Sequence, residues 1–241
     1  MARKNDRPPD QLRPIKFTRS YTDQSPGSVL AEFGRTRVLC TVCVQEQVPP
    51  WMYNKQPGGW LTAEYSMLPA SGIPRKPREG RTGKPLDGRT QEIQRMIGRA
   101  LRCALDITAL PELTLWVDCD VLTADGGTRT TAINGAAVAL YDALLWMEEK
   151  RMLRAWPLRG LVSAVSVGLL QDQVITDLDY QEDSAAAVDI NIACASDGRL
   201  IEISGAAETK PFTPEQFQLM LSLGQKGCAQ VLELQKKVLG I

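Results

Sequence analysis

The sequence has no histidine among its 241 residues. Zinc sites and histidine-activated nucleophiles are therefore disfavoured, and any enzymatic chemistry must come from other side chains. No apolar run approaches the roughly 18 residues that span a bilayer, and residues 1–20 lack the apolar centre of a signal peptide. We expect a protein that resides in the cytoplasm and has no membrane partner.

No proline-rich, serine-rich or acidic stretch divides the chain, and its length suits one large domain. We expect residues 1–241 to form a single domain. Cys40 and Cys43 form a C-x-x-C, but strand residues three apart point to opposite faces, which argues against a shared metal ion. All the cysteines lie in patterns typical of a reduced protein core: Cys40, Cys43, Cys103, Cys119, Cys194 and Cys228.

Net charge is also absent, since 28 Lys and Arg balance 28 Asp and Glu. A neutral protein does not coat nucleic acid through bulk attraction. The charges are nevertheless segregated: residues 75–102 contain nine bases and three acids, residues 1–20 contain six and two, and residues 171–208 contain nine acids and one base. This division suits an anionic polymer that is gripped in one place and cut in another. The alternative is that the charges solvate separate faces.

The hydrophobic pattern alternates between strands and helices along the chain. Thr90 is placed as the N-cap of the first helix, and Thr213, Pro214 and Gln216 supply the capping signals of the last. Strands are predicted at residues 27–33, 36–44, 60–67, 113–123, 161–170, 174–180, 188–195 and 200–204. Helices are predicted at about 90–105, about 130–150 and from 213 nearly to the end.

Two basic surfaces accompany these elements. Residues 70–88 are rich in Pro, Gly, Arg and Lys and have no periodicity, so we expect a long basic surface loop. Arg95, Arg99 and Arg102 share one face of the first helix. That face is either solvated or a contact for nucleic acid.

A glycine-rich turn lies between the strand at 113–123 and the following helix. Unpaired N–H groups and the positive end of the helix dipole favour an anion there. Gly126 and Gly127 permit close approach, while Thr128 can donate a hydroxyl hydrogen bond. Arg129 can bind two phosphate oxygens through its planar fork. The turn lacks the pattern of a Walker A loop, and taken alone it is equally well explained as a turn capped by threonine.

Further candidates lie on either side of this turn in the sequence. Arg89, at the start of a predicted helix, is a second candidate anion ligand, although one arginine in that position is common. On the strand at 188–195, Asp189 and Asn191 point to the polar side. If Asp183 folds back beside Asp189, the two carboxylates would bind Mg²⁺ or share one proton near neutrality. The alternative is a solvated acidic loop.

Four long segments closely resemble the ribonuclease PH family: WLTAEYSMLP (60–69), GRTQEIQR (88–95), DCDVLTADGGTRT (118–130) and EDSAAAVDIN (182–191). The resemblance covers nearly the whole chain. It implies an α/β (α+β) fold of two similar sheet-plus-helix halves and a ring-shaped homohexamer built as a trimer of dimers. It also implies a phosphorolytic 3′→5′ exoribonuclease, a tRNA nucleotidyltransferase that trims tRNA precursors and releases nucleoside diphosphates.

The resemblance also implies which residues form the site. The sequence departs from the family pattern at Asn134, at Ile190 where Met is usual, and at Ala206 where Thr is usual, which removes a hydroxyl near the acidic residues. The family's essential carboxylates, which are also the candidates for Mg²⁺, fall on Asp183 and Asp189. Its phosphate ligands fall on Arg89, Gly127, Thr128 and Arg129.

Inorganic phosphate, the expected co-substrate and nucleophile, is already anionic at neutral pH, so the reaction needs no activated Ser, Cys or His. The arginines would position it, and the carboxylates would serve the leaving 3′ oxygen by protonating it or by holding Mg²⁺. The loop at 70–88, the basic segment 1–20, Arg95 and Arg99 would guide the RNA backbone.

Two rival functions remain open. A metal-dependent hydrolytic nuclease would release monophosphates without added phosphate. A catalytically silent RNA-binding ring subunit would have no activity at all, but the presence of both arginines and both aspartates argues against it.

Overall fold

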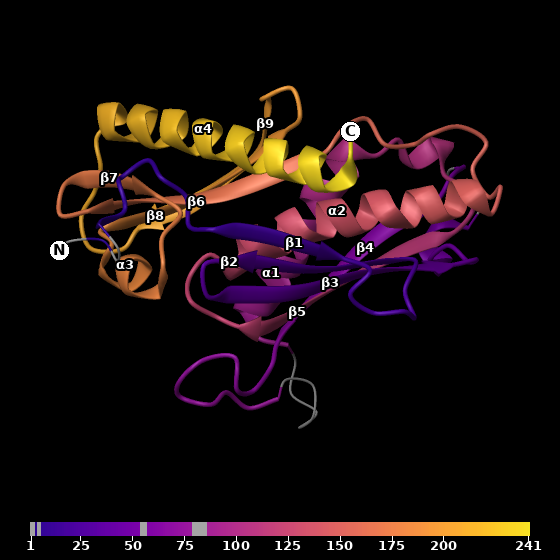
Figure 1. Ribbon diagram of the computed structural model, residues 1–241, viewed down its shortest axis with the longest axis horizontal. Coiled ribbons are helices and arrows are strands. Elements are labelled where there is room, and N and C mark those ends of the chain that lie inside the picture. Colours follow the sequence, from indigo (N-terminus) through magenta and orange to yellow (C-terminus); the bar gives the residue numbers. More distant parts are fainter. Residues whose placement is uncertain (1–2, 4–5, 54–56, 79–85) are drawn as a thin grey trace.

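The chain folds into two β-sheets with helices between them and above them (Figure 1). The computed structural model describes residue 3 and residues 6–53, 57–78 and 86–241. The first sheet has five strands in the order β1-β2-β3-β5-β4, and the second has four in the order β7-β6-β8-β9. Within these described residues, neighbouring strands are antiparallel except for β4 and β5, which are parallel.

The first half of the chain provides the first sheet and the two helices that pack on it. In chain order its elements are β1 (Ile15–Arg19), β2 (Gly27–Phe33), β3 (Thr36–Gln45), β4 (Trp60–Met67), α1 (Gly88–Ala104), β5 (Thr114–Thr123) and α2 (Thr128–Glu149). The second half provides β6 (Val162–Leu170), β7 (Gln173–Thr176), α3 (Tyr180–Ala185), β8 (Val188–Ala195), β9 (Leu200–Ala207) and α4 (Pro214–Leu239). Short 3-10 turns lie at Pro50–Met52 and Ile107–Ala109.

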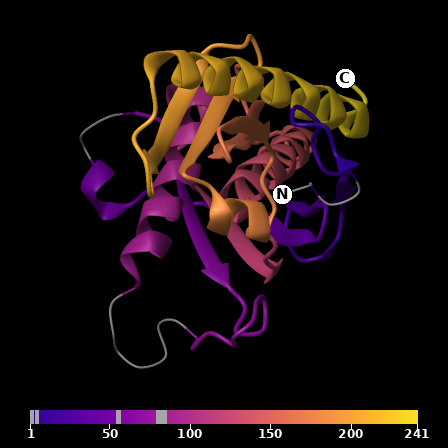
Figure 2. The ribbon, with the colours of Figure 1, turned by 90° about the vertical axis from the view of Figure 1, so that its left-hand side faces the viewer.

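The second sheet lies between two layers of helices. On one face α2 contacts β6, and α1 contacts β6, β8 and β9, while α4 covers the other face through β6, β7 and β8. Figure 2 shows α4 running across this outer face. Every residue of β6 is buried because both faces of the strand are covered. A single hydrophobic cluster contains residues from both sheets, such as Leu115 and Val167, so the two halves share one core.

The mixed α/β class and the two sheet-plus-helix halves predicted from the sequence are confirmed. The capping box at the start of α4 is also present, since Gln216 N–H donates to Thr213 Oγ1 and Thr213 N–H donates to Gln216 Oε1. Among the described residues, no helix combines the length and the hydrophobicity that crossing a bilayer requires.

Two predicted details are wrong, and one strand was not predicted. Thr90 is not the N-cap of α1, because that helix begins earlier, at Gly88, and Thr90 is buried in its first turn. The strand predicted at 174–180 ends at Thr176, because Asp177 adopts a left-handed φ of 56° and Asp179 then caps α3. Strand β1 was not predicted, because its Arg, Lys and Thr side chains obscure the strand pattern.

The basic loop at 70–88 is described only in part, because residues 79–85 lie outside the described ranges. Residues 71–78 contain no helix or strand, and they extend away from the body of the molecule (Figure 1). Arg75, Lys76 and Arg78 are exposed along this segment.

The cysteines are free thiols, and their positions are mostly those expected. Cys40 is buried while Cys43 is half-buried and contacts Ser25, so the two do point to opposite faces of β3. Cys103 is the exception, because it lies on the exposed side of α1. The prediction of six core cysteines is therefore wrong at Cys103.

Candidate active site

A polar cavity of about 680 Å³ opens where the first turns of α1 and α2 meet α3, β8 and β9. The cavity is lined by Arg89 from α1, Arg129 from α2, Asp183 from α3 and Asp189 from β8. The structure thus brings together both candidate arginines and both candidate carboxylates, which come from opposite halves of the chain. Glu208, which follows β9, also lines the cavity and was given no role from the sequence.

The turn that leads into α2 has a backbone that only glycine adopts readily. Gly126 and Gly127 have φ angles of +78° and +63°, in the left-handed region. Gly127 is the N-cap of α2, and its lack of a side chain leaves the first N–H groups of the helix without a side-chain acceptor. These N–H groups, with the positive end of a 22-residue helix, provide a site for an anion.

Thr36 fixes the orientation of this turn from the adjacent strand β3. Its buried hydroxyl donates to the carbonyl oxygen of Gly126 at 2.7 Å and accepts from the N–H of Asp125 at 2.9 Å. Because the peptide unit is planar, holding the Gly126 carbonyl also holds the N–H of Gly127 on the opposite side. The donors are therefore oriented before any ligand arrives.

Tyr65 prepares the side chain of Thr128 in a similar way. The Tyr65 hydroxyl on β4 donates to Thr128 Oγ1 at 2.8 Å. With its oxygen accepting this bond, the Thr128 hydroxyl can direct its own hydrogen to an anion. Burial raises the pKa of Tyr65, so the phenol stays a neutral donor at physiological pH. Tyr65 lies in the strand predicted at 60–67, but the sequence did not indicate this contact.

Asp183 is presented to the cavity by the short helix α3. A capping box starts this helix, in which Asp179 accepts from the N–H groups of Gln181 and Glu182, and Glu182 accepts from the N–H of Asp179. This reciprocal pair compensates for the low intrinsic stability of a six-residue helix. Burial raises the pKa of Asp183, and the charges of Arg89 and Arg129 oppose that shift.

Asp189 lies on β8 between two buried residues that point the other way, as the alternation of the strand predicts. Burial, reinforced by the negative charge of Asp183, raises the pKa of Asp189 to about 6. The positive charges of Arg129 and Arg89 and a hydrogen bond from Asn191 limit the shift. The carboxyl group therefore changes charge close to neutral pH.

One oxygen of Asp189 is left for a ligand. Asn191 Nδ2 approaches Asp189 Oδ2 at 3.5 Å, whereas the buried Oδ1 has no hydrogen-bond partner within the described ranges. Ala206 pairs with Asp189 across β8 and β9, so the residue opposite supplies no hydroxyl. A buried carboxylate oxygen without a partner is costly unless a proton or a cation joins it.

The carboxylate pair fits Mg²⁺ as a partial ligand set. Mg²⁺ prefers oxygen ligands and usually combines one or two carboxylates with water and substrate phosphates. Asp183 and the unpartnered oxygen of Asp189 match that chemistry. No group of three or more His, Cys, Asp or Glu side chains arranged for a metal occurs in the part of the chain that is described. An ion here would therefore need oxygens from substrate and water.

Three arginines of the basic N-terminal segment are engaged in ion pairs within the protein. Arg3 Nε binds Glu182 Oε1 at 2.7 Å, and Arg7 Nη2 binds Glu182 Oε2 at 2.8 Å. Arg13 binds Asp177, and all three arginine side chains are nearly buried in these pairs. The prediction that the segment guides RNA is wrong for these arginines, because their charges are neutralised by Glu182 and Asp177.

The arginines of α1 are divided between structural and exposed positions. Arg99 pairs with Glu202 on β9, with a distance of 3.1 Å from Nε to Oε2. Arg102 donates to the carbonyl oxygen of Leu61 and lies 4.8 Å from the ring centre of Trp60. Arg95 is exposed. The predicted basic stripe is thus partly engaged within the protein.

A polar cavity lined by two arginines and two aspartates, next to a turn suited to an anion, is typical of an enzyme that acts on phosphate groups. The domain 1 model of the 3′ exoribonuclease family matches residues 11–145, and the domain 2 model matches residues 160–227. The chain belongs to the 3′ exoribonuclease family. The boundary between the two family domains coincides with the link between the two sheets.

Two relatives named ribonuclease PH match nearly the full length of the chain. The chain is 48% identical to the ribonuclease PH of Hydrogenobaculum sp. (strain Y04AAS1) over 97% of its own length and 91% of that protein. It is 51% identical to the ribonuclease PH of Tropheryma whipplei (strain Twist), over 98% and 94% of the two chains.

Solved structures share the fold at lower identity. Rice Rrp46 aligns with a TM-score of 0.78 and 20% identity, over 98% of this chain and 100% of the other. The Archaeoglobus fulgidus exosome with RNA bound to the active site aligns with a TM-score of 0.78 and 19% identity, over 96% and 91%. At these identities the likeness shows a common fold.

Proposed function

We propose that this protein is a phosphorolytic 3′→5′ exoribonuclease that trims the 3′ ends of tRNA precursors. Inorganic phosphate is the co-substrate and nucleophile, and nucleoside diphosphates are the products. The observation that carries the proposal is the meeting of Arg89 and Arg129 with Asp183 and Asp189 around one cavity. Ribonucleases PH that match nearly the full length at about half identity support it. Residence in the cytoplasm remains a prediction.

The chemical difficulty of phosphorolysis is to bring one anion against another. Arg129 and Arg89 neutralise phosphate and the scissile phosphodiester, while the N–H groups at the start of α2 and the Thr128 hydroxyl fix the direction of attack. These groups are oriented before binding, since Thr36 holds the turn and Tyr65 holds Thr128. The protein thus supplies positioning and charge stabilisation, and it needs no activated side-chain nucleophile.

The leaving 3′ oxygen requires a proton or a cation. Asp189 is placed to protonate it, because its Oδ1 is buried without a partner in the described chain and its pKa of about 6 keeps a fraction protonated at neutral pH. Mg²⁺ held by Asp183 and Asp189 would, when bound, stabilise the charge on that oxygen in place of the proton. Burial raises the pKa of Asp183 while the charges of Arg89 and Arg129 lower it, and its ionised form helps to orient the two arginines.

Incubation of a 3′-extended tRNA with and without phosphate tests this function. We expect shortening only with phosphate and nucleoside diphosphates as products. Arg129→Ala should lower the rate by about 10²–10³-fold, the usual cost of removing a donor that stabilises transition-state charge. Arg199→Ala, which removes an exposed arginine from the turn before β9, outside the cavity, is the matched control and should retain phosphate-dependent activity.

The product identifies the rival functions. Nucleoside monophosphates formed without phosphate would indicate a hydrolytic nuclease. RNA binding without shortening under any condition would indicate a silent ring subunit. Equal rates for Arg129→Ala and the unchanged protein at limiting phosphate would contradict the assignment of the phosphate site.

We further propose that six copies assemble as a ring, a trimer of dimers, that binds RNA. The fold that this chain shares with an archaeal exosome core and with rice Rrp46 supports ring assembly. The exposed Arg75, Lys76 and Arg78 of the loop, with Arg95, would contact the RNA backbone without reading its sequence.

A further inference from the structure

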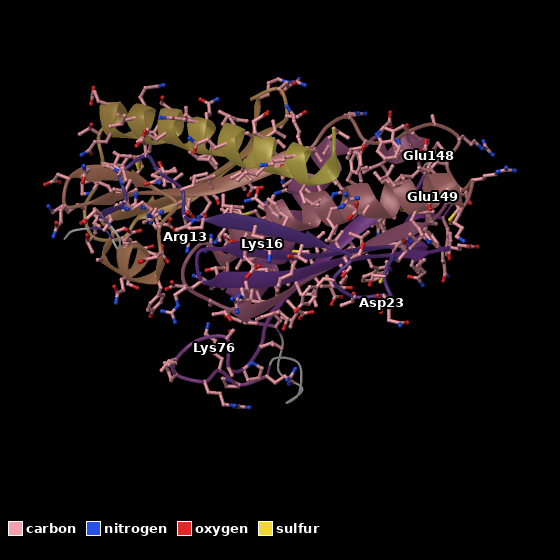
Figure 3. The ribbon with its side chains drawn as sticks, viewed as in Figure 1. Arg13, Lys16, Asp23, Lys76, Glu148 and Glu149 are labelled. Carbon is pink, nitrogen blue, oxygen red and sulfur yellow. The ribbon has the colours of Figure 1, made fainter. Side chains whose placement is uncertain are left out.

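The buried ion pair between Arg13 and Asp177 lies behind the turn at residues 125–127, which we call the phosphate-binding turn. Figure 3 shows Arg13 next to the start of β1, where the first half of the chain meets the loops of the second half. Arg13 Nη2 binds Asp177 Oδ1 at 2.7 Å and Arg13 Nε binds Asp177 Oδ2 at 3.0 Å, a two-point contact. The two side chains are only 7% and 3% exposed, so solvent does not weaken the contact.

The remaining donor of Arg13 reaches the phosphate-binding turn itself. Arg13 Nη1 donates to the carbonyl oxygen of Asp125 at 2.7 Å. A Cβ added to Gly127 would lie only 2.9 Å from Arg13 Nη2, so the guanidinium also packs directly beneath the N-cap of α2. The planar guanidinium of Arg13 therefore contacts the phosphate-binding turn and the Asp177 carboxylate at the same time.

Asp177 controls the carboxylate side of the cavity through the residues that follow it. Its left-handed φ of 56° turns the chain from β7 toward α3. The next carbonyl, that of Leu178, lies so close to Gly126 that an added Cβ there would approach it to 2.5 Å. Asp179 then caps α3, which carries Asp183. A displacement of Asp177 would thus move the packing surface of the turn and the helix that presents a carboxylate.

We infer that Arg13 is a positioning residue that sets the phosphate-binding turn against the carboxylates by holding Asp125 and Asp177 together. The inference rests on the proposed function and adds to it a residue that does not itself line the cavity. The rigid fork of a guanidinium fixes three acceptor atoms in one plane, whereas lysine has a single nitrogen on a flexible stem. A lysine at position 13 keeps the positive charge, but it should therefore not reproduce the function of Arg13.

The chain offers a matched control in Arg19 and Asp142. Arg19 also makes a two-point contact with an aspartate, at 3.0 Å from Nε to Oδ2, and also donates to a main-chain oxygen, that of Val238. This pair joins β1 to α2 and α4 far along the helix from its first turn. Arg19→Lys therefore measures the loss of a comparable cross-element pair away from the cavity.

The test compares Arg13→Lys, Arg19→Lys and the unchanged protein in steady-state phosphorolysis and in thermal unfolding. For Arg13→Lys we expect a raised KM for phosphate and a lowered kcat, with kcat/KM reduced by about 10²-fold, the usual cost of misplacing reacting groups by about 1 Å. Arg19→Lys should stay within about twofold of the unchanged protein in both constants, an effect no larger than about 0.4 kcal/mol. If Arg13→Lys does not fold, Asp177→Asn serves instead, because asparagine tolerates the left-handed conformation.

A second readout does not depend on activity. Phosphate should raise the Tm of the unchanged protein and of Arg19→Lys, and raise that of Arg13→Lys much less at the same concentration. Equal phosphate-induced shifts in all three proteins, or unchanged kinetic constants in Arg13→Lys beside a lowered Tm, would overturn the positioning role. If the unchanged protein lacks phosphorolysis, the proposed function fails, and the Tm shifts alone decide about Arg13.

Discussion

At the level of the single residue, the burial of Asp189 lowers the stability of the fold and at the same time favours the chemistry of the site. Its carboxyl is mostly buried, lies near Asp183 and has an oxygen without a hydrogen-bond partner among the described residues. Such an arrangement destabilises the ionised folded state, but it also keeps a proton available near neutral pH. Active sites commonly hold groups of this kind, because the same burial that is unfavourable for folding tunes the chemistry.

Asp189→Asn should therefore be more stable than the unchanged protein at neutral pH and inactive. The pKa of Asp189 is raised from 3.8 to about 6, so protonation stabilises the fold, fully below pH 3.8, and this stabilisation is lost as the pH rises through 6. Asparagine does not titrate. The advantage of the variant in free energy of unfolding should grow between pH 4 and pH 7.5, by up to about 3 kcal/mol.

Denaturant unfolding at several pH values measures this difference. Asp197→Asn is the control, because Asp197 is exposed and its pKa is lowered by the N–H and side chain of Arg199. Its stability difference should not grow over the same range. Parallel stability curves for Asp189→Asn and the unchanged protein between pH 4 and pH 7.5 would show that the carboxyl is not destabilised by burial.

The site residues themselves were recognisable in the sequence because each sits in a local pattern: a glycine-rich turn before a helix, an arginine at a helix start, an aspartate on the polar side of a strand. Their mutual distances were not, since the cavity joins residues 89, 129, 183 and 189 from four elements. Tyr65 and Glu208 were missed as contributors because their roles depend on which chain segment faces them.

At the level of the element, the turn before α2 is stabilised by contacts on several sides. Thr36 binds its carbonyl and N–H groups, and the Leu178 to Asp179 peptide packs against Gly126. A glycine in this place serves two needs, a left-handed φ and space for the neighbouring backbone. The two needs can be separated by mutation.

Gly126→Ala and Gly198→Ala form a matched pair for this purpose. Both glycines have positive φ, +78° and +83°, but a Cβ on Gly198 would meet no atom within 4 Å. Gly198→Ala should cost about 1 kcal/mol of stability, from backbone strain alone, and leave phosphorolysis unchanged. Gly126→Ala should cost more and remove phosphate-dependent activity, because the added carbon displaces the segment that leads to α3.

Thermal unfolding and the rate at limiting phosphate distinguish these effects. Full activity in Gly126→Ala would mean that the turn tolerates a shift of the adjoining backbone. A large loss of activity in Gly198→Ala would mean that left-handed strain anywhere impairs the enzyme, and the comparison would then carry no information about the site.

Long periodic elements were the best predicted part of the fold. The strand at 60–67 agrees with the sequence because burial alternates along it, and the capped start of α4 agrees because its capping contacts join residues three apart. The helix α3 was missed because its six residues complete fewer than two turns and leave no periodicity to detect. Its capping signal is Asp179 followed by Glu182, which could have indicated it.

At the level of the whole molecule, the two halves depend on a few long-range polar contacts besides the shared core. Asn134 on α2 exchanges hydrogen bonds with Ala164 on β6, and Gln235 on α4 donates to the carbonyl oxygens of Asn134 and Val162. The sequence marked Asn134 only as a departure from the family pattern. Its role is evident once α2 is seen to pack against β6, which no local pattern encodes.

The proposed ring makes a prediction about mass. Light scattering coupled to gel filtration should give a particle of six times the 26.5 kDa chain. Dimers should be the product of partial dissociation, because a trimer of dimers has two kinds of contact and separates first at the weaker one. A stable monomer that retains full phosphorolytic activity would contradict the proposed assembly.

The contacts of the N-terminal arginines determine when the active site can form during synthesis of the chain. Arg13 is separated from Asp177 by 164 positions, and Arg3 from Glu182 by 179. The N-terminal segment can therefore make these contacts only after the later segments have been synthesised. A ribosome-bound chain shorter than these separations cannot complete the active site. Contacts of such long range form slowly. The nascent enzyme should consequently be unable to act on RNA until nearly all of the chain has left the ribosome.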